Sequence, residues 1–347
     1  MRFSTMRFLF TLLFFLCLKF YAQVPGSTSF AFLKSSFSAR SMALGGKVVS
    51  LYDQDLSLVN ENPALLNASM NGQMHFNQSI LPSGIHFSAL NYALKTKVGV
   101  FAPSVRYVNY GNFTETDEIG NQIGKFNASD MAIGSNYAYS FNDVLHVGAS
   151  ANLIASNIAS FTAYGFSVGF GGMLVHPNKL FTAGFSVQNI GWTFKNFTDN
   201  NPSILPIDVT AAASLKLKHA PFRFTLLGKQ LNRWNVVYED PNRKPTFDPL
   251  SGDTIPVKNA GFFEILANHA AAHVELLASE KFHFRMGFDY HRREQLKVVE
   301  RPGLAGFSFG VGLKFKKFNL DYGFMVMNNA GQNHAIAVST QLSNWIK

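Results

Sequence analysis

The sequence predicts an all-β fold: a transmembrane antiparallel β-barrel of about 14 strands with a small N-terminal plug. Three observations support this prediction. Only 15% of the 347 residues are charged, whereas charged residues make up about a quarter of a typical soluble domain. Apolar and polar residues alternate along most of the chain after about residue 73. The connections between these alternating segments are short and long in turn, as in outer-membrane barrels.

The first 22 residues predict a secretory signal peptide. Arg2 and Arg7 give a basic start, residues 8–20 are mostly apolar, and Ala22 is a small residue at the expected cleavage point. A spanning helix needs about 20 apolar residues, and no later window of the chain contains them. The single cysteine, Cys17, lies in this segment, so the expected mature chain has no disulfide and no cysteine-based site.

The charge balance argues against a nucleic-acid partner. Removing Arg2, Arg7 and Lys19 with the signal peptide leaves 27 basic residues against the 21 acidic residues of the chain. This mild excess is spread along the sequence without a dense Lys/Arg block. Nucleic-acid binding therefore has little support.

Residues 23–72 are expected to form an N-terminal extension and plug. Residues 23–37 contain Pro25, Gly26 and several serines, and we expect them to be exposed. Residues 39–66 show neither strand alternation nor a long amphipathic helix, because glycine and proline interrupt them. The residues to which we assign a structural role in the plug are Arg40, Gly45, Gly46, Asp53, Asp55, Asn62 and Pro63.

The charged plug residues allow two interpretations each. Asp53 and Asp55 fit helix or turn caps, and a metal pair is the alternative, although no third ligand clusters with them. Arg40 predicts a structural salt bridge, with ligand binding as the alternative. Its expected partners are Asp53 or Asp55 within the plug, or a lumen carboxylate such as Asp289 or Asp321.

Residues 73–347 are expected to form the barrel, and residues 281–290 show the pattern most clearly. Phe282, Phe284, Met286, Phe288 and Tyr290 share one face, while Lys281, His283, Arg285, Gly287 and Asp289 share the other. The segments 164–171, 181–188, 209–217, 307–315 and 318–326 alternate in the same way. Glycine repeatedly takes a polar-face position, where a missing side chain leaves room for something inside a barrel. Alternation alone fits a sandwich core as well as a lipid-facing wall.

Connection lengths distinguish a barrel from a sandwich. We expect short turns at 95–97, 142–143, 177–179, 219–221, 279–281 and 316–317, and longer loops at 109–128, 156–162, 191–205, 232–259 and 292–303. The connections 81–84 and 328–331 are short where a long loop is expected. Tight turns on one side and long loops on the other are typical of outer-membrane barrels. The sequence therefore favours a barrel.

The segment 259–280 predicts a short helix or loop ending near Asn268, followed by a strand. His269 and His273 are four residues apart, which on a helix is a zinc-binding spacing. On a strand two such residues lie roughly 13 Å apart on one face, too far to share a metal, and we favour the strand. Neither a GxSxG motif nor a recognisable Ser/His/Asp constellation points to an enzyme.

The plug segment resembles the hatch motif of FadL-like outer-membrane barrels. The matching residues are Ala39, Arg40, Ala43 to Gly46, Asp55, and Asn62 to Ala64. Within that superfamily the chain is similar to the PorQ-type barrels of the type IX secretion system, through residues 110–113, 117–121, 287–293 and 306–310. The resemblance covers essentially the whole expected mature chain, with the exception of residues 232–259.

The resemblance implies a plugged 14-stranded barrel in the outer membrane of a Gram-negative bacterium, with no enzymatic activity and no cofactor or metal. It implies contact with outer-membrane lipid and lipopolysaccharide, and a place in an attachment complex with PorU-like and PorV-like components and a peripheral PorZ-like surface protein. The alternative function is a FadL-like transporter for hydrophobic small molecules. The expected outer loops 109–128, 191–205 and 232–259 are largely polar, which favours docking of a partner.

Overall fold

The computed structural model describes residues 28–198, 204–237, 245–247, 254–255, 260–298, 303–328 and 331–345. The expected signal peptide, residues 1–22, lies outside this part of the chain, as does most of the expected loop 232–259.

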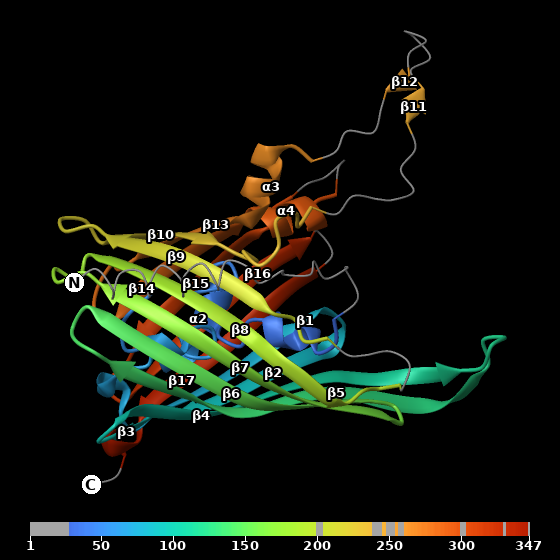
Figure 1. The fold of residues 1–347 in the computed structure, drawn as a ribbon, viewed down its shortest axis with the longest axis horizontal. Coiled ribbons are helices and arrows are strands. Elements are labelled where there is room, and N and C mark those ends of the chain that lie inside the picture. The colour runs from blue at the N-terminus through green and yellow to red at the C-terminus, as the bar shows by residue number, and fades with distance from the viewer. Residues whose placement is uncertain are drawn as a thin grey trace, which may run out of the picture.

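Fourteen antiparallel strands of the described chain close into a barrel (Figure 1), as the sequence predicts. They are β1 (Gln73–Leu81), β2 (Ile85–Tyr92), β4 (Gly99–Thr116), β5 (Gln122–Ser140), β6 (Leu145–Ile158), β7 (Phe161–Val175), β8 (Phe181–Lys195), β9 (Asp208–Lys216), β10 (Phe222–Gly228), β13 (Ala270–Leu276), β14 (Phe282–Asp289), β15 (Phe307–Lys314), β16 (Phe318–Asn328) and β17 (Gly331–Gln341). Pairing of β1 with β17 and of β2 with β4 closes the ring, and β3 (Leu94–Thr96) continues β2 along β4.

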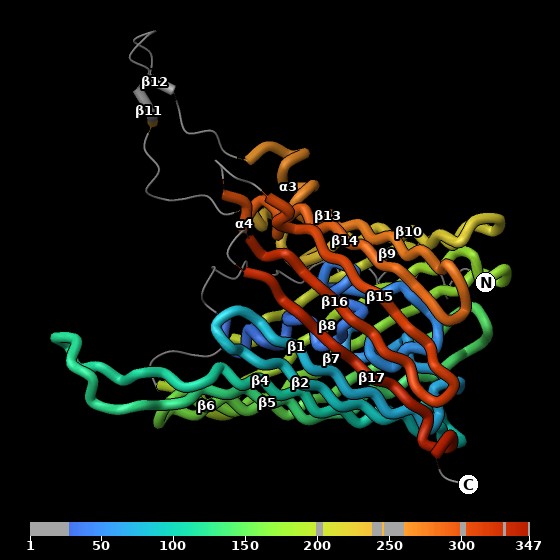
Figure 2. Tube along the Cα trace, turned by 180° about the vertical axis from the view of Figure 1, so that it is seen from behind, coloured from blue at the N-terminus to red at the C-terminus, as the bar shows by residue number. Residues whose placement is uncertain are grey.

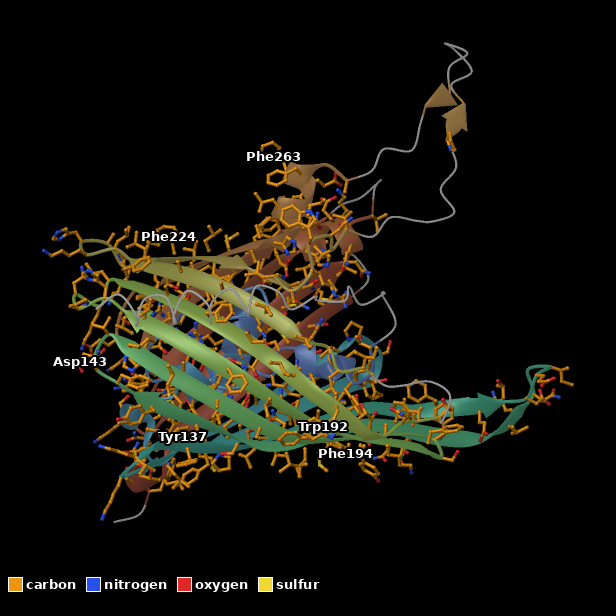
Figure 3. The ribbon with its side chains drawn as sticks, viewed as in Figure 1. Tyr137, Asp143, Trp192, Phe194, Phe224 and Phe263 are labelled. Atoms are coloured by element: carbon orange, nitrogen blue, oxygen red, sulfur yellow. The ribbon has the colours of Figure 1, made fainter. Side chains whose placement is uncertain are left out.

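Side-chain alternation places the apolar face outside. In β14, Arg285 and Asp289 are buried within the barrel, whereas Phe282 and Phe284 are each 40% exposed. Figure 3 likewise shows Trp192, Phe194 and Phe224 on the outer surface. A soluble sandwich would bury these aromatic residues, so the exposed apolar band is the wall that faces lipid. Tyr290 was expected to continue the strand but begins α4 (Tyr290–Leu296), because the Asp289 side chain accepts a hydrogen bond from the Arg292 N–H and caps that helix.

All the predicted short turns lie at one end of the barrel, which we call the short-turn end. They occupy residues 97–98, 141–144, 176–180, 217–221, 277–281 and 315–317. The start of β1 and the end of β17 lie at the same end.

At the opposite end, the loop end, two expected loops are strands. Residues 109–128 form the outer part of a long β4–β5 hairpin that projects beyond the other strands (Figure 2). Residues 156–162 are also mostly strand, because β6 and β7 meet at the turn 159–160. The expected helix near Asn268 is present as α3 (Phe262–His269) and leads into β13. The remaining described pieces of the 232–259 loop include the pair β11 (Thr246–Phe247) and β12 (Thr254–Ile255).

The N-terminal segment lies inside the barrel as a chain of short helical turns (Figure 1). They are η1 (Ala31–Lys34), α2 (Ala39–Ala43), η2 (Leu56–Leu58), η3 (Pro63–Leu65) and η4 (Ala68–Met70). No helix in the described ranges has the length and hydrophobicity to cross a membrane.

The expectation that residues 23–37 are exposed holds for Ala31 and Ser35 but is wrong for the phenylalanines of the described part, residues 28–37. Phe30, Phe32 and Phe37 are buried and pack against the wall residues Phe87 and Val108. Phe37 meets Phe87 edge-on, with ring centroids 5.1 Å apart. The serines between these aromatic residues suggest an exposed segment, but the lumen supplies an apolar surface that the phenylalanines cover.

Candidate functional site

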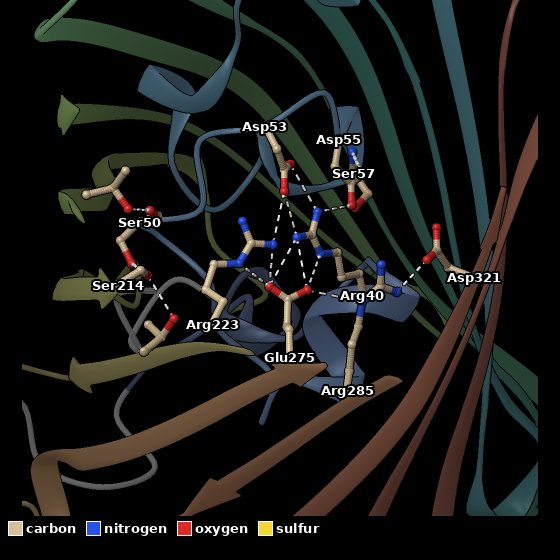
Figure 4. A network of polar contacts seen from close by, with 12 residues as sticks. Arg40, Ser50, Asp53, Asp55, Ser57, Ser214, Arg223, Glu275, Arg285 and Asp321 are labelled. Atoms are coloured by element: carbon tan, nitrogen blue, oxygen red, sulfur yellow. Dashed lines mark hydrogen bonds and ion pairs between the residues drawn. The ribbon is translucent and has the colours of Figure 1, made fainter. Parts of the chain in front are cut away.

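Arg40 lies at the centre of an ion-pair network between plug and wall (Figure 4). It sits on α2, which begins after Ser38, whose side chain accepts a hydrogen bond from the backbone N–H of Ser41. Its guanidinium lies 2.7 Å from Asp53, 2.9 Å from Asp55 and 3.0 Å from Glu275 of β13. Two plug carboxylates and one wall carboxylate thus share a single buried arginine.

Two wall arginines extend this network. Arg223 of β10 pairs with Glu275 and lies 3.3 Å from Asp53. Arg285 of β14 lies 3.3 Å from Glu275 and also pairs with Asp321 of β16. Glu275 therefore contacts three arginines, and the network joins the four strands β10, β13, β14 and β16 to the plug. Burial makes such a set costly to break, because removal of one partner leaves an uncompensated charge in a low-dielectric interior.

Of the partners predicted for Arg40, those in the plug bind it and those in the wall do not. Asp53 and Asp55 both bind it, whereas Asp289 and Asp321 do not. Asp289 is held by Lys229 and Arg292, and Asp321 is held by Arg285. The missed partner is Glu275, and the signal for it was its inward position in the alternating segment 273–276.

Asp55 has a second role as a helix cap. Its side chain accepts a hydrogen bond from the Ser57 N–H at 2.9 Å, at the start of η2. Burial opposes its ionisation, but the Arg40 guanidinium, His75 and the hydrogen bond from Ser57 together outweigh burial and lower the pKa of Asp55 to about 2. Asp55 is therefore ionised at every physiological pH, and its pairing with Arg40 does not titrate there. Within the described ranges no group of three His, Cys, Asp or Glu residues is arranged to bind a metal.

Gly45 and Gly46 reverse the chain immediately after α2. Both have positive φ angles, 88° and 89°, which glycine adopts without strain. The turn places the Gly45 carbonyl where it accepts a hydrogen bond from Arg292 of α4 at 2.9 Å. Lys47 then pairs with Asp208 of β9 at 2.8 Å. The turn at the glycine pair thus places Gly45 and Lys47 in contact with the barrel.

Glu61 is a buried plug carboxylate that accepts a hydrogen bond from the Val48 N–H. Burial raises the pKa of Glu61 to about 7, although nearby Lys47 opposes the shift. Its charge therefore changes near neutral pH, unlike that of Asp55.

Wall glycines make room for the plug, as the polar-face glycines of the sequence suggest. An added Cβ would clash with plug atoms in six strands, at Gly148 (Pro63 carbonyl carbon, 2.4 Å), Gly171 (Asn62 Oδ1, 1.9 Å), Gly184 (Val49 O, 1.9 Å), Gly287 (Gly45 N, 2.4 Å), Gly310 (Ala43 Cβ, 2.3 Å) and Gly323 (Ala39 O, 2.1 Å). Asn62 also caps η3 and donates to the Val49 carbonyl at 2.7 Å, and Pro63 is the first residue of that turn. The plug thus lies directly against the bare backbone of the barrel, in four of the six places through its own backbone.

One cavity adjoins the plug. This polar cavity of about 450 Å³ lies at the short-turn end, and Arg40, Asp53 and Arg285 are among its lining residues. A separate apolar groove of about 1060 Å³ lies on the outer face of β7 to β10, where the exposed side chains of Phe185, Leu226 and Trp234 line it. The ion-pair network therefore borders a polar space.

No family model matches the sequence, and no curated protein matches it. Solved structures do match in fold. A TodX ΔS2S3 mutant, a monoaromatic hydrocarbon channel, is 13% identical with a TM-score of 0.53, covering 88% of this chain and 99% of that one. The Pseudomonas putida toluene transporter TodX is 12% identical, with a TM-score of 0.51. The match covers 88% of this chain and 96% of the transporter chain. The chain therefore has the 14-stranded fold of FadL/TodX-like outer-membrane barrels.

Proposed function

We propose that this chain is a PorQ-like, non-enzymatic barrel of the type IX secretion attachment complex. It anchors a peripheral, PorZ-like surface protein, and works beside PorU-like and PorV-like components where cargo is processed and joined to lipopolysaccharide. The sequence resemblance supports this assignment. The structural observation that carries it is the β4–β5 hairpin, which includes residues 110–113 and 117–121 of that resemblance.

The outer part of the hairpin offers a binding surface for a protein. β4 pairs with β2 only as far as Asn109, and β5 pairs with β6 only from Ala128. Beyond these residues β4 and β5 pair with each other and with no other described strand. Phe113, Ile119 and Ile123 are 42%, 85% and 63% exposed. Free strand edges beside apolar side chains are the features used when a partner adds a strand.

The contacts of the plug support the anchoring of a partner rather than the passage of a substrate through the lumen. Ion pairs of Arg40 and Lys47 join it to β13 and β9, and its atoms lie directly against glycines of six strands. Opening such a lumen requires breaking buried charge pairs, each at a cost of several kcal/mol. A fixed plug suits a barrel whose role is to hold a partner at its outer end.

Shortening the hairpin tests this function. Removal of residues 112–127, with Gly111 joined to Ala128, leaves the barrel part of both strands in place. We expect the shortened barrel to reach the outer membrane, the surface partner to be shed into the medium, and cargo to remain unprocessed. Phe161→Ala at the β6–β7 tip is the control and should retain the partner. Retention of the partner by the shortened barrel would show that the hairpin is not the docking element.

The second candidate is a FadL-like transporter for hydrophobic small molecules. The shared fold with the toluene transporter and the apolar groove on the outer face of β7 to β10 favour it. Under this hypothesis, loss of the barrel reduces uptake of a hydrophobic substrate and leaves cargo processing unchanged. Parallel uptake and processing assays on one deletion strain therefore separate the two functions.

A further inference from the structure

The polar cavity at the short-turn end has the plug on its inner side. Arg40, Asp53 and Asp55 line it there, and the arginine pairs with both carboxylates. On the wall, Asp321 pairs with Arg285 in the same way. The ion-pair network thus balances its own charges, and this side of the cavity offers a ligand little net charge. The volume of about 450 Å³ is that of a small-molecule site.

Four lysines line the rest of the same cavity, and we call them the basic mouth: Lys281, Lys314, Lys316 and Lys317. Lys281 and Lys314 continue the inward-facing rows of β14 and β15, next to His283 and Gly312 in those rows. None of the four lysines forms an ion pair with another residue in the described ranges. Glu280 is the lining carboxylate outside the network. Four lysines against one carboxylate leave an excess of three positive charges inside the lumen.

Backbone contacts hold the lysines of the basic mouth together. The N–H of Lys314 donates to the carbonyl of Lys281 at 2.8 Å, so the β13–β14 and β15–β16 turns lie side by side. The ammonium of Lys317 lies 4.7 Å from the centre of the Trp345 ring. The Thr340 hydroxyl donates to the Lys317 carbonyl at 2.7 Å. Like charges held in one cavity repel one another, and an anion between them removes that repulsion.

Neutral side chains add a second kind of binding group. Carboxamides of Gln73, Asn319, Gln341 and Asn344 line the cavity. Gln73 is 6% exposed, and its Oε1 atom has no hydrogen-bond partner among the residues that the structure describes. A buried acceptor normally has a partner, and a ligand hydroxyl supplies the donor that Gln73 lacks.

We propose that this cavity binds a small solute that carries a phosphate group and several hydroxyl groups, the chemistry of a sugar phosphate. The lysines attract the phosphate as point charges, and the carboxamides bind the hydroxyls. Tight turns of outer-membrane barrels face the periplasm, so the ligand enters from that side. An acidic protein segment fits less well, because a chain that enters a cavity backed by the plug must turn round within about 450 Å³. The site lies at the end opposite the β4–β5 hairpin and is independent of the proposed docking function.

Calorimetric titration of the purified barrel in a neutral detergent tests the proposal. Glucose-6-phosphate, glucose and inorganic phosphate are titrated separately, and glucose-6-phosphate should bind most tightly. An exposed ion pair contributes up to about fivefold to affinity, so K281Q/K314Q should weaken the binding of glucose-6-phosphate by up to about 25-fold. The matched control, K179Q/K218Q, removes two lysines from other turns of the same end. Neither of those lines the cavity, and the affinity should not change.

Gln73→Met tests the hydroxyl contact separately. The change keeps a side chain of similar length but removes the acceptor. It should weaken glucose-6-phosphate by about fivefold, the effect of one hydrogen bond, and leave inorganic phosphate unchanged. Equal weakening of the two ligands would overturn the role assigned to Gln73.

Four outcomes would overturn the proposal as a whole. The first is glucose-6-phosphate binding no tighter than glucose, and the second is an equal loss of affinity in the two double variants. The third is equal affinity for inorganic phosphate and glucose-6-phosphate, which would identify a simple anion site. The fourth is tighter binding of a tetraglutamate peptide, which would identify an acidic protein segment. Unchanged thermal unfolding of K281Q/K314Q checks that the variant is folded, and the comparison of ligands on the unaltered barrel needs no variant.

Discussion

Replacement of Gly184 by alanine should loosen the plug without touching its charges. The new Cβ would lie 1.9 Å from the Val49 carbonyl oxygen and 2.7 Å from the Val49 carbonyl carbon. Ordinary contact begins at 3.4 Å, so the plug backbone must retreat by about 1.5 Å (3.4 minus 1.9). Both sides of the contact are backbone, and neither has a side chain that can rotate away.

The cost follows from the contacts that such a shift breaks. Ser50 adjoins the clash, and its hydroxyl lies 2.7 Å from that of Ser214, while its carbonyl accepts from Thr182 at 2.6 Å. A shift of about 1.5 Å removes both hydrogen bonds, at roughly 1 kcal/mol each. Overpacking adds about 1–3 kcal/mol. We therefore expect Gly184→Ala to destabilise plug docking by about 3–5 kcal/mol.

Hydrogen exchange of the plug amides measures this effect. A loss of this size lowers the protection of residues 48–51 by about 100- to 4,000-fold. Gly172→Ala is the matched control, because Gly172 lies in the neighbouring strand β7 and an added Cβ there meets no atom within 4 Å. Equal protection in the two variants would refute the close contact between plug and wall.

Three further predictions concern single side chains. Glu275→Gln should lower the free energy of unfolding by about 3–5 kcal/mol, because three arginines lose a buried counter-charge. The surface change Glu294→Gln should cost below about 1 kcal/mol. Equal costs of the two changes in calorimetry would contradict the network. Glu61 keeps its proton in the folded plug up to about pH 7 but loses it near pH 4.5 when unfolded, so plug stability should fall by about 3 kcal/mol as pH rises through this window. Glu61→Gln should abolish that slope in exchange measurements, and a persistent slope would exclude Glu61 as its origin. Phe37→Ala should lower the free energy of unfolding by about 3–5 kcal/mol, measured by thermal unfolding. Phe263→Ala, at a site 82% exposed, should lower it by about 0.5 kcal/mol or less. Similar losses in the two variants would show that the Phe37 contacts add no stability.

Local pattern and connection lengths together predicted the barrel, because each strand shows its two faces within its own residues. In β14, alternation separated Phe282 and Phe284 from Arg285, and the short and long connections then indicated that the apolar face meets lipid. Hairpin length was harder to predict. The bilayer sets a minimum of about ten residues per strand, but backbone pairing continues past it, so β4 and β5 extend through residues that look like a polar loop.

Long-range contacts could not be predicted from the sequence. Asp53 and Asp55 are close to Arg40 in the chain and were predicted as its partners, whereas Glu275 is 235 residues away. Glu275, Asp289 and Asp321 all face inward, and only barrel closure decides which cation each one meets. The burial of Phe30, Phe32 and Phe37 was missed for the same reason, since the apolar surface that covers them belongs to distant strands.

Deletion of the gene, followed by fractionation of the cells, tests the proposed function most directly. The surface partner and sorted cargo are followed in the medium and the outer membrane, and uptake of a hydrophobic substrate is measured in the same strain. The docking function predicts that the partner is shed, cargo stays unprocessed and uptake is unchanged. Normal cargo processing with reduced uptake would contradict it and establish the transporter instead.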